Sequence, residues 1–186
     1  LFSDVKGNAI HRWRPEQGVE TFLEPSGYGG QQPFAGEEPG ANGLAFDREG
    51  RLLICEHGDR RVRRLEPDGR RTTLADRFQG RRFNSPNDLT CATNGDLYFT
   101  DPAFGLPGRF EDPDRELPFC GVYRLTPTGE LALLIEDLEA PNGIALSPDE
   151  RTLFVADGDP GRSAYLAFPL GEGGVLEVLR VRRRDL

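Results

Sequence analysis

Three asparagines stand at similar places in three similar stretches of the sequence. Asn42 occurs in Ala-Asn-Gly-Leu-Ala-Phe, Asn87 in Pro-Asn-Asp-Leu and Asn142 in Pro-Asn-Gly-Ile-Ala-Leu. Amide oxygens are hard ligands that, with carboxylates and water, suit Ca²⁺ or a more octahedral ion such as Mg²⁺ or Mn²⁺. Asn before Gly or Asp also forms turns ahead of strands in many proteins. The spacing is therefore compatible both with a metal site and with a simple turn.

Glu56, His57 and Asp101 are the other candidates for chemistry, since each ends an apolar run. A Glu-His pair at the mouth of a site can orient a substrate or move a proton, although a single His is often only a surface hydrogen-bonding residue. Asp101 can line the same site or accept hydrogen bonds from the backbone of the next loop. The sequence has no GxSxG, Walker, HExxH or Cys-pair zinc motif. Serine nucleophiles, nucleotide hydrolysis and zincin chemistry therefore find no support.

The asparagine stretches belong to a longer repeat. Asn87 follows Asn42 by 45 residues and precedes Asn142 by 55, and such a period indicates an array, a solenoid or a propeller. A turn and a second apolar run follow each stretch, at Leu52–Glu56, Leu97–Asp101 and Leu153–Asp157. Alternating residues with X-Gly turns come next and are typical of hairpins. The sequence thus predicts an all-β fold, a β-propeller with four strands in each blade.

The repeat also predicts where the strands lie. The innermost strands are expected at Gly43–Phe46, Leu89–Cys91 and Gly143–Leu146, and Leu131–Glu139 is expected to be a strand although it also permits a helix. Residues 1–186 are predicted to form a single partial propeller domain of about four blades' worth of sequence. Leu1–Asp4 matches the second strand of a unit and Val175–Arg180 the fourth strand of the last one. We therefore expect a ring that is cut short, since propellers close with four to eight blades.

The meander of a blade places the candidate residues on one rim. The start of the first strand and the end of the second lie at the same edge of an up-and-down sheet. Asn87 should therefore share a face with Asp101, and Asn42 with Glu56 and His57. The long connection 102–119, rich in Pro, Gly and acidic residues, should leave from that edge and cover the mouth, where functional loops are often found.

Composition excludes several classes of partner. The chain has 23 basic and 31 acidic residues, a net charge of −8, and 37% hydrophobic residues, which argues against nucleic acid as a partner. Its longest apolar run, near Leu131–Ile135, is far below the roughly 20 residues that span a membrane. Three cysteines without metal-site spacing are interpreted as small buried side chains in a reducing compartment. The sequence therefore predicts no membrane contact and a cytoplasmic location, and gives no indication of oligomeric state.

Four motifs in order resemble the gluconolactonase and regucalcin (senescence marker protein) family. They are Cys-Glu-His-Gly-Asp-Arg-Arg-Val from Cys55, Arg-Phe-Asn-Ser-Pro-Asn-Asp-Leu from Arg82, Tyr-Phe-Thr-Asp-Pro from Tyr98 and Ala-Pro-Asn-Gly-Ile-Ala from Ala140. The resemblance covers nearly the whole chain. It implies a six-bladed propeller that hydrolyses sugar lactones with a divalent metal in its central funnel. Ca²⁺ is the expected metal here, with Mg²⁺, Mn²⁺ and Zn²⁺ as alternatives.

The resemblance assigns residues only in part. It implies Asn142 as a metal ligand, with Asn87 on the metal and substrate side of the funnel, whereas Asn42 is expected only to line it. The Glu of the family's metal site would precede Leu1. Its Asp, the family's candidate general base, would follow Leu186. No catalytic base can thus be named within the chain.

The expected function is metal-dependent hydrolysis of a sugar lactone, which is a small-molecule substrate. This chain is expected to be one part of the enzyme and to be inactive alone. Glu56, His57 and Asp101, with Asn42 and Asn87, are the expected substrate-side residues. Two alternatives stay open at this point. One is a propeller that serves as a binding scaffold without catalysis. The other is a propeller enzyme of the strictosidine synthase type, a more distant relative of the family.

Overall fold

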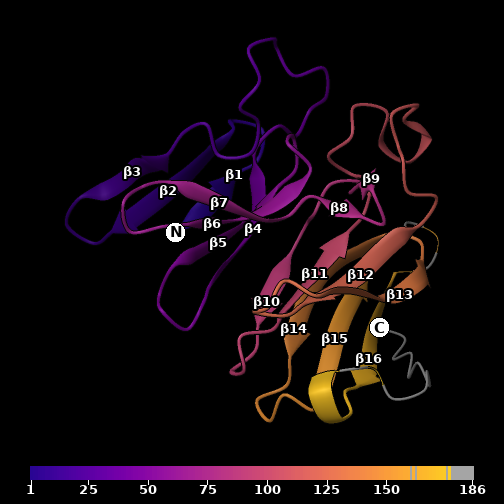
Figure 1. Ribbon diagram of the computed structural model, residues 1–186. Helices are drawn as coiled ribbons and strands as arrows, with labels where there is room; N and C mark the ends of the chain where they lie inside the picture. Colours follow the sequence, from indigo (N-terminus) through magenta and orange to yellow (C-terminus); the bar gives the residue numbers. More distant parts are fainter. Residues whose placement is uncertain (160, 162, 175, 177–186) are drawn as a thin grey trace.

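The computed structural model describes residues 1–159, 161, 163–174 and 176. Within them the chain forms four antiparallel sheets of three or four strands and one short hairpin (Figure 1). The first sheet contains β1 (Phe2–Asp4), β2 (Ala9–Arg14) and β3 (Gly18–Leu23). The second contains β4 (Ala41–Phe46), β5 (Leu52–Glu56), β6 (Arg61–Leu65) and β7 (Arg71–Ala75).

The small hairpin β8 (Arg77–Phe78) and β9 (Arg81–Arg82) connects to the third sheet. This sheet contains β10 (Leu89–Cys91), β11 (Leu97–Asp101), β12 (Cys120–Leu125) and β13 (Leu131–Leu138). The fourth contains β14 (Pro141–Leu146), β15 (Thr152–Asp157) and β16 (Ala164–Pro169). Two 3₁₀ turns, η1 (Arg109–Glu111) and η2 (Glu172–Gly174), are the described helical segments.

Strands neighbouring in sequence pair in order within each sheet, so the sheets are meanders as the repeat predicts. The three predicted innermost strands are β4, β10 and β14, and residues 131–138 form the strand β13 and not a helix. The predicted last strand, Val175–Arg180, lies outside the described residues except for Leu176, which forms a single bridge with Leu170.

Tight turns join the first two strands of each unit. At Asp47–Gly50 the amide of Gly50 donates to the carbonyl of Asp47 at 3.0 Å, and Gly50 has a φ of 74°. Gly95 has a φ of 90° at the equivalent turn of the third sheet. Glycine reaches this left-handed region without steric cost, which fixes the hairpin register and hence where the following strand ends.

Buried side chains on both faces of the sheets hold the units together. β11 is buried at every position, because Phe99 packs toward the second sheet while Tyr98 packs toward the fourth. Phe83, Phe99 and Tyr123 form a cluster with ring centroids 5.1–5.3 Å apart. Such clusters contribute both apolar burial and favourable ring geometry. The alternation along one strand therefore links three consecutive sheets.

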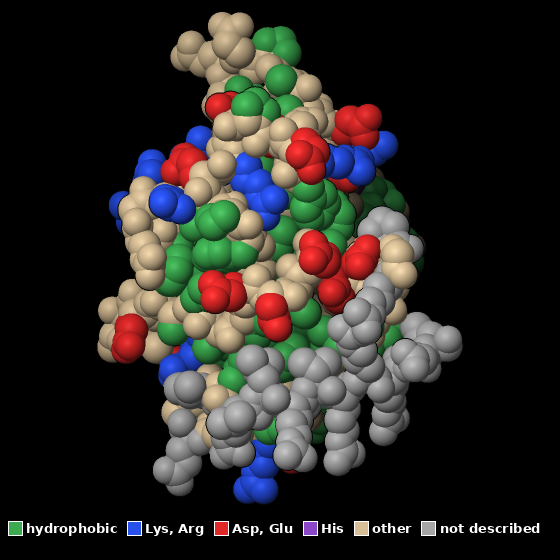
Figure 2. Space-filling model, turned by 90° about the vertical axis from the view of Figure 1, so that its right-hand side faces the viewer, with side chains coloured by type: hydrophobic (Ala, Val, Ile, Leu, Met, Phe, Trp, Pro, Cys, Tyr) green, Lys and Arg blue, Asp and Glu red, His purple; other side chains and the backbone are tan. Residues whose placement is uncertain are grey.

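Two long loops lie on one side of the sheets, at the top of Figure 1: residues 24–40 between β3 and β4, and residues 102–119 between β11 and β12. Exposed apolar side chains occur mainly on the two outer sheets, among them Trp13 and Tyr165, which are 60% and 58% exposed. Figure 2 shows one side of the molecule, on which apolar side chains are visible between acidic ones. Neither described helical turn is long and apolar enough to cross a membrane.

The Phe83 cluster gives a stability prediction. Phe83→Ala should lower the free energy of unfolding by about 3–5 kcal/mol, because it removes a fully buried ring and leaves a cavity. Phe46→Ala is the matched control, since Phe46 is 57% exposed and should change stability by no more than about 0.5 kcal/mol. Denaturant unfolding measures both. Equal effects of the two substitutions would contradict the proposed role of the cluster.

Candidate metal and substrate site

A residue in a β-strand fixes the backbone of each of the three asparagines. Ser3 Oγ donates to the carbonyl of Asn42 at 2.6 Å, and Thr100 Oγ1 donates to the carbonyl of Asn142 at 2.7 Å. The amide of Asn87 donates to the carbonyl of Thr100 at 2.8 Å. Thr100 therefore joins Asn87 to Asn142, and the three asparagines lie on the same rim.

His57 brings two of these side chains together. Its Nε2 lies 3.2 Å from Asn42 Nδ2 and 3.3 Å from Asn87 Nδ2. The ring is fully buried, and its Nδ1 lies 3.4 Å from Glu38 Oε2. The interaction with His57 is the main cause that lowers the pKa of Glu38. The structure thus confirms that Asn42 and His57 share a face, and it adds Glu38, which the sequence analysis did not single out.

Asn142 stands at the next position around the rim. Its side chain is exposed. A Cβ placed on Gly158 would lie 3.9 Å from the Cβ of Asn142 and 3.8 Å from the ring of Phe104. The beginning of the 102–119 loop therefore lies near Asn142. The site is exposed to solvent on the side where Asn142 lies.

Glu56 does not join this cluster, contrary to its expected role beside His57. Its fully buried carboxylate accepts hydrogen bonds from Arg61 Nε at 2.6 Å and Arg71 Nη1 at 3.0 Å. Burial raises the pKa of Glu56, and the interaction with Arg61 opposes that rise. Side chains alternate along an extended chain, which accounts for the separation of Glu56 from His57. Glu56 is thus held by Arg61 and Arg71, apart from the asparagine cluster.

Asp101 also has a supporting position. Its oxygens accept the backbone amides of Asn84 and Ser85, both at 2.8 Å. Its full burial raises its pKa to about 7, although these two hydrogen bonds oppose the rise. Asp157 repeats the arrangement by accepting the amide of Ala140 at 2.9 Å. Asp101 thus fixes the segment that leads into Asn87 and does not face the asparagine cluster.

The 102–119 loop covers the rim that carries Asn87, as the meander predicts. The amide of Gly105 donates to Ser85 Oγ at 2.9 Å, and Ser85 Oγ donates to the carbonyl of Pro102. A Cβ on Gly105 would lie 2.7 Å from the Cβ and Cγ of His57. Only glycine can approach the ring so closely. The first residues of the loop are therefore packed against His57.

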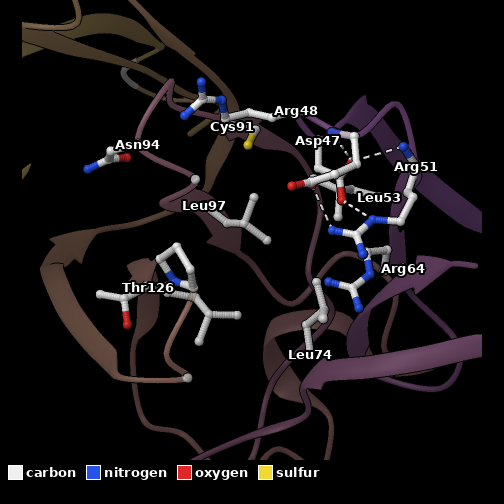
Figure 3. A pocket seen from close by; sticks show the side chains of 15 residues that line it. Asp47, Arg48, Arg51, Leu53, Arg64, Leu74, Cys91, Asn94, Leu97 and Thr126 are labelled. Carbon is white, nitrogen blue, oxygen red and sulfur yellow. Dashed lines mark hydrogen bonds and ion pairs between the residues drawn. The ribbon is translucent and has the colours of Figure 1, made fainter.

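A cavity lies elsewhere. It measures about 400 Å³ and opens on the opposite rim, between the second and third sheets, and the turns at Asp47 and Thr126 both line it (Figure 3). Arg51 Nε donates to Asp47 Oδ2 at 2.7 Å in its wall, and Leu53 and Leu97 line its floor. None of Asn42, Asn87, Asn142 and His57 lines this cavity, so it is separate from the candidate site.

Comparison with known proteins identifies the family of the chain. Residues 1–181 match the family described as the SMP-30/gluconolactonase/LRE-like region. The chain belongs to this family. It is 40% identical over 178 residues to a gluconolactonase of Zymomonas mobilis, covering 94% of this chain and 50% of that protein. A 31% match over 115 residues to strictosidine synthase-like protein 6 of Arabidopsis thaliana covers 60% of this chain and 31% of that protein.

Solved structures support the same assignment for this SMP-30/gluconolactonase chain. A gluconolactonase from Xanthomonas campestris superposes with a TM-score of 0.78 at 36% identity, over 98% of this chain and 56% of that one. The β-propeller fold is therefore confirmed. The chain spans about half the length of the relatives that it matches.

Asp101 gives a prediction of pH dependence. Between its ordinary pKa near 3.8 and its raised value of about 7, the folded protein keeps a proton that the unfolded chain has lost. Stability should therefore fall as the pH rises through this window, by at most about 1.4 kcal/mol for each pH unit. The side chain of Asp101→Asn cannot titrate, so the stability of this variant should fall less over the same pH range. Chemical unfolding at pH 4–8 tests this, and parallel curves for the two proteins would contradict it.

Proposed function

We propose that the protein containing this chain hydrolyses a sugar lactone with the help of a divalent metal. The single observation that carries the proposal is the 40% identity to a gluconolactonase over 94% of the chain. The convergence of Asn42 and Asn87 on His57, beside Asn142, adds a structural reason. These polar residues meet on the rim that a loop partly covers, where a small polar substrate can enter.

The residues on this rim fit part of a divalent metal site. Asn87 and Asn142 would supply amide oxygens, which suit Ca²⁺ first and Mg²⁺, Mn²⁺ or Zn²⁺ as alternatives. Among the described residues no three His, Cys, Asp or Glu side chains form a metal-binding group, so the carboxylates of the site would come from outside them. Bound there, a divalent ion polarises a carbonyl and lowers the pKa of a water ligand.

The other residues have supporting roles. Asn42 lines the site and can hydrogen-bond to a sugar hydroxyl. His57 is not placed as a general base, because its ring is fully buried and its Nε2 already faces two amide donors. Gly105 and the loop around it exclude water from one side of the site. The proton acceptor of the reaction therefore lies outside this set.

We also propose a cytoplasmic location and a small-molecule sugar lactone as the partner of the site. Cys55, Cys91 and Cys120 are all free thiols, which is consistent with a reducing compartment. Trp13 and Tyr165 are exposed on the outer sheets. Exposed apolar side chains of this kind are typical of surfaces that further blades would cover.

The full gene product provides the test of function. It should hydrolyse glucono-lactone in the presence of Ca²⁺ or Mn²⁺ and lose this activity with a chelator. Asn142→Ala should weaken metal binding and lower turnover together, by about tenfold or more. Asn94→Ala is the control, because Asn94 lies on the opposite rim. Unchanged metal affinity in calorimetry would exclude Asn142 as a ligand.

A second experiment concerns the 186-residue chain alone. It should show little or no lactonase activity, because neutral amides without carboxylates hold a divalent ion weakly. Exposed strand edges and apolar outer faces should also favour its association. Turnover of the chain and of the full gene product is compared with the same lactone and metal. Equal turnover would show that the amides and the other residues of this chain suffice.

A further inference from the structure

We propose that Glu38 and His57 form a positioning device that turns the amide oxygens of Asn42 and Asn87 toward the site. His57 acts here through the asparagines and does not react with the substrate. The orientation itself is independent of the reaction, whereas its effect on metal binding and turnover rests on the function proposed above. Neither the sequence motifs nor the comparisons assign a role to Glu38.

The first step is the protonation state of the ring. Asn Nδ2 can only donate hydrogen bonds. Two such groups, from Asn42 and Asn87, lie within 3.3 Å of His57 Nε2, so Nε2 must carry the lone pair and Nδ1 the proton. Glu38 Oε2 is the acceptor atom that faces Nδ1, at 3.4 Å, and it favours a proton on that nitrogen although the alignment here falls short of a hydrogen bond. Because the ring is fully buried, water cannot take the place of either partner.

The second step is the direction of the oxygens. An Asn side chain offers its oxygen and its amino group on opposite sides. With both amino groups held by His57, the oxygens of Asn42 and Asn87 point away from the ring. Turning either amide would place its oxygen against the Nε2 lone pair and take a donor away from this buried acceptor, at a cost of about 1–3 kcal/mol. The oxygens are therefore presented as a pair.

The third step is the rigidity of the device. The amides of His57 and Gly58 donate to the carbonyls of Gly40 and Pro39, both at 3.3 Å, which places Glu38 beside the ring. Gly105 contacts the other side of the ring, where a Cβ would come within 2.8 Å of Nδ1. Segments of two loops thus pack against His57.

The tautomer can be measured directly. In nitrogen NMR of the full gene product with the ring neutral, His57 should show a protonated Nδ1 and an unprotonated Nε2. Glu38→Gln keeps an acceptor oxygen and should preserve this pattern, whereas Glu38→Ala should weaken it and mobilise the side-chain amides of Asn42 and Asn87. A protonated Nε2 in the unaltered protein would overturn the proposal, whatever the activity of the protein.

Metal affinity and kinetics test the consequence. Glu38→Ala should weaken Ca²⁺ or Mn²⁺ binding in calorimetry by about tenfold, the lower end of the effect of lost supporting contacts, and Glu38→Gln should restore most of it. Glu37→Ala is the matched control, because the Glu37 side chain is 74% exposed and pairs with Arg109. An equal loss in Glu37→Ala, or full affinity in Glu38→Ala, would contradict the proposal. A protein that binds no metal but shows the predicted tautomer would refute the proposed function alone.

Discussion

Close approach of the innermost strands is the constraint on which the rest of the structure depends. The amide of Gly43 donates to the carbonyl of Asn87 in the next sheet at 2.7 Å, and a Cβ on Gly43 would lie 2.6 Å from Asp88 Cα. Asp88 continues the connection by accepting the amide of Ile144 at 3.1 Å. Burial raises the pKa of Asp88, and this hydrogen bond opposes the rise. Because backbone meets backbone here, polar residues at the strand ends of separate sheets are brought together.

The part of the site that depends on strand register could be predicted from the sequence. Asn42, Asn87 and Asn142 occupy one position of a repeat, and a meander places that position at one rim. The strand β13 followed from the same repeat, although its residues alone permit a helix. The loop after Asp101 had to leave from the rim of Asn87 for the same reason. In each case the order of short strands along the chain decides where a residue or loop lies, and side-chain packing changes that position little.

The roles of individual side chains were less predictable, because they depend on which partner is close in space. Glu56 and His57 are adjacent in sequence, yet one carboxylate is bound by arginines and the neighbouring ring by asparagines. Glu38 lies in an irregular loop, and no periodic pattern marks it. Its position depends on the hydrogen bonds of Pro39 and Gly40 to the residues after β5, and such contacts between a loop and a distant turn leave no signal in the spacing of residue types.

An imidazole that accepts hydrogen bonds at Nε2, as proposed for His57, is well suited to the centre of the proposed site. A buried Lys or Arg would repel a divalent ion. A buried carboxylate at this position would either bind the ion itself or, without the ion, cost much free energy to bury unpaired. His57 accepts two amide donors without adding charge. The charge that fixes its tautomer belongs to Glu38, whose side chain is 26% exposed and therefore retains part of its hydration. The proposed arrangement separates the ring that orients the amides from the carboxylate that bears the charge, so the ring itself need not add a positive charge beside the amide oxygens.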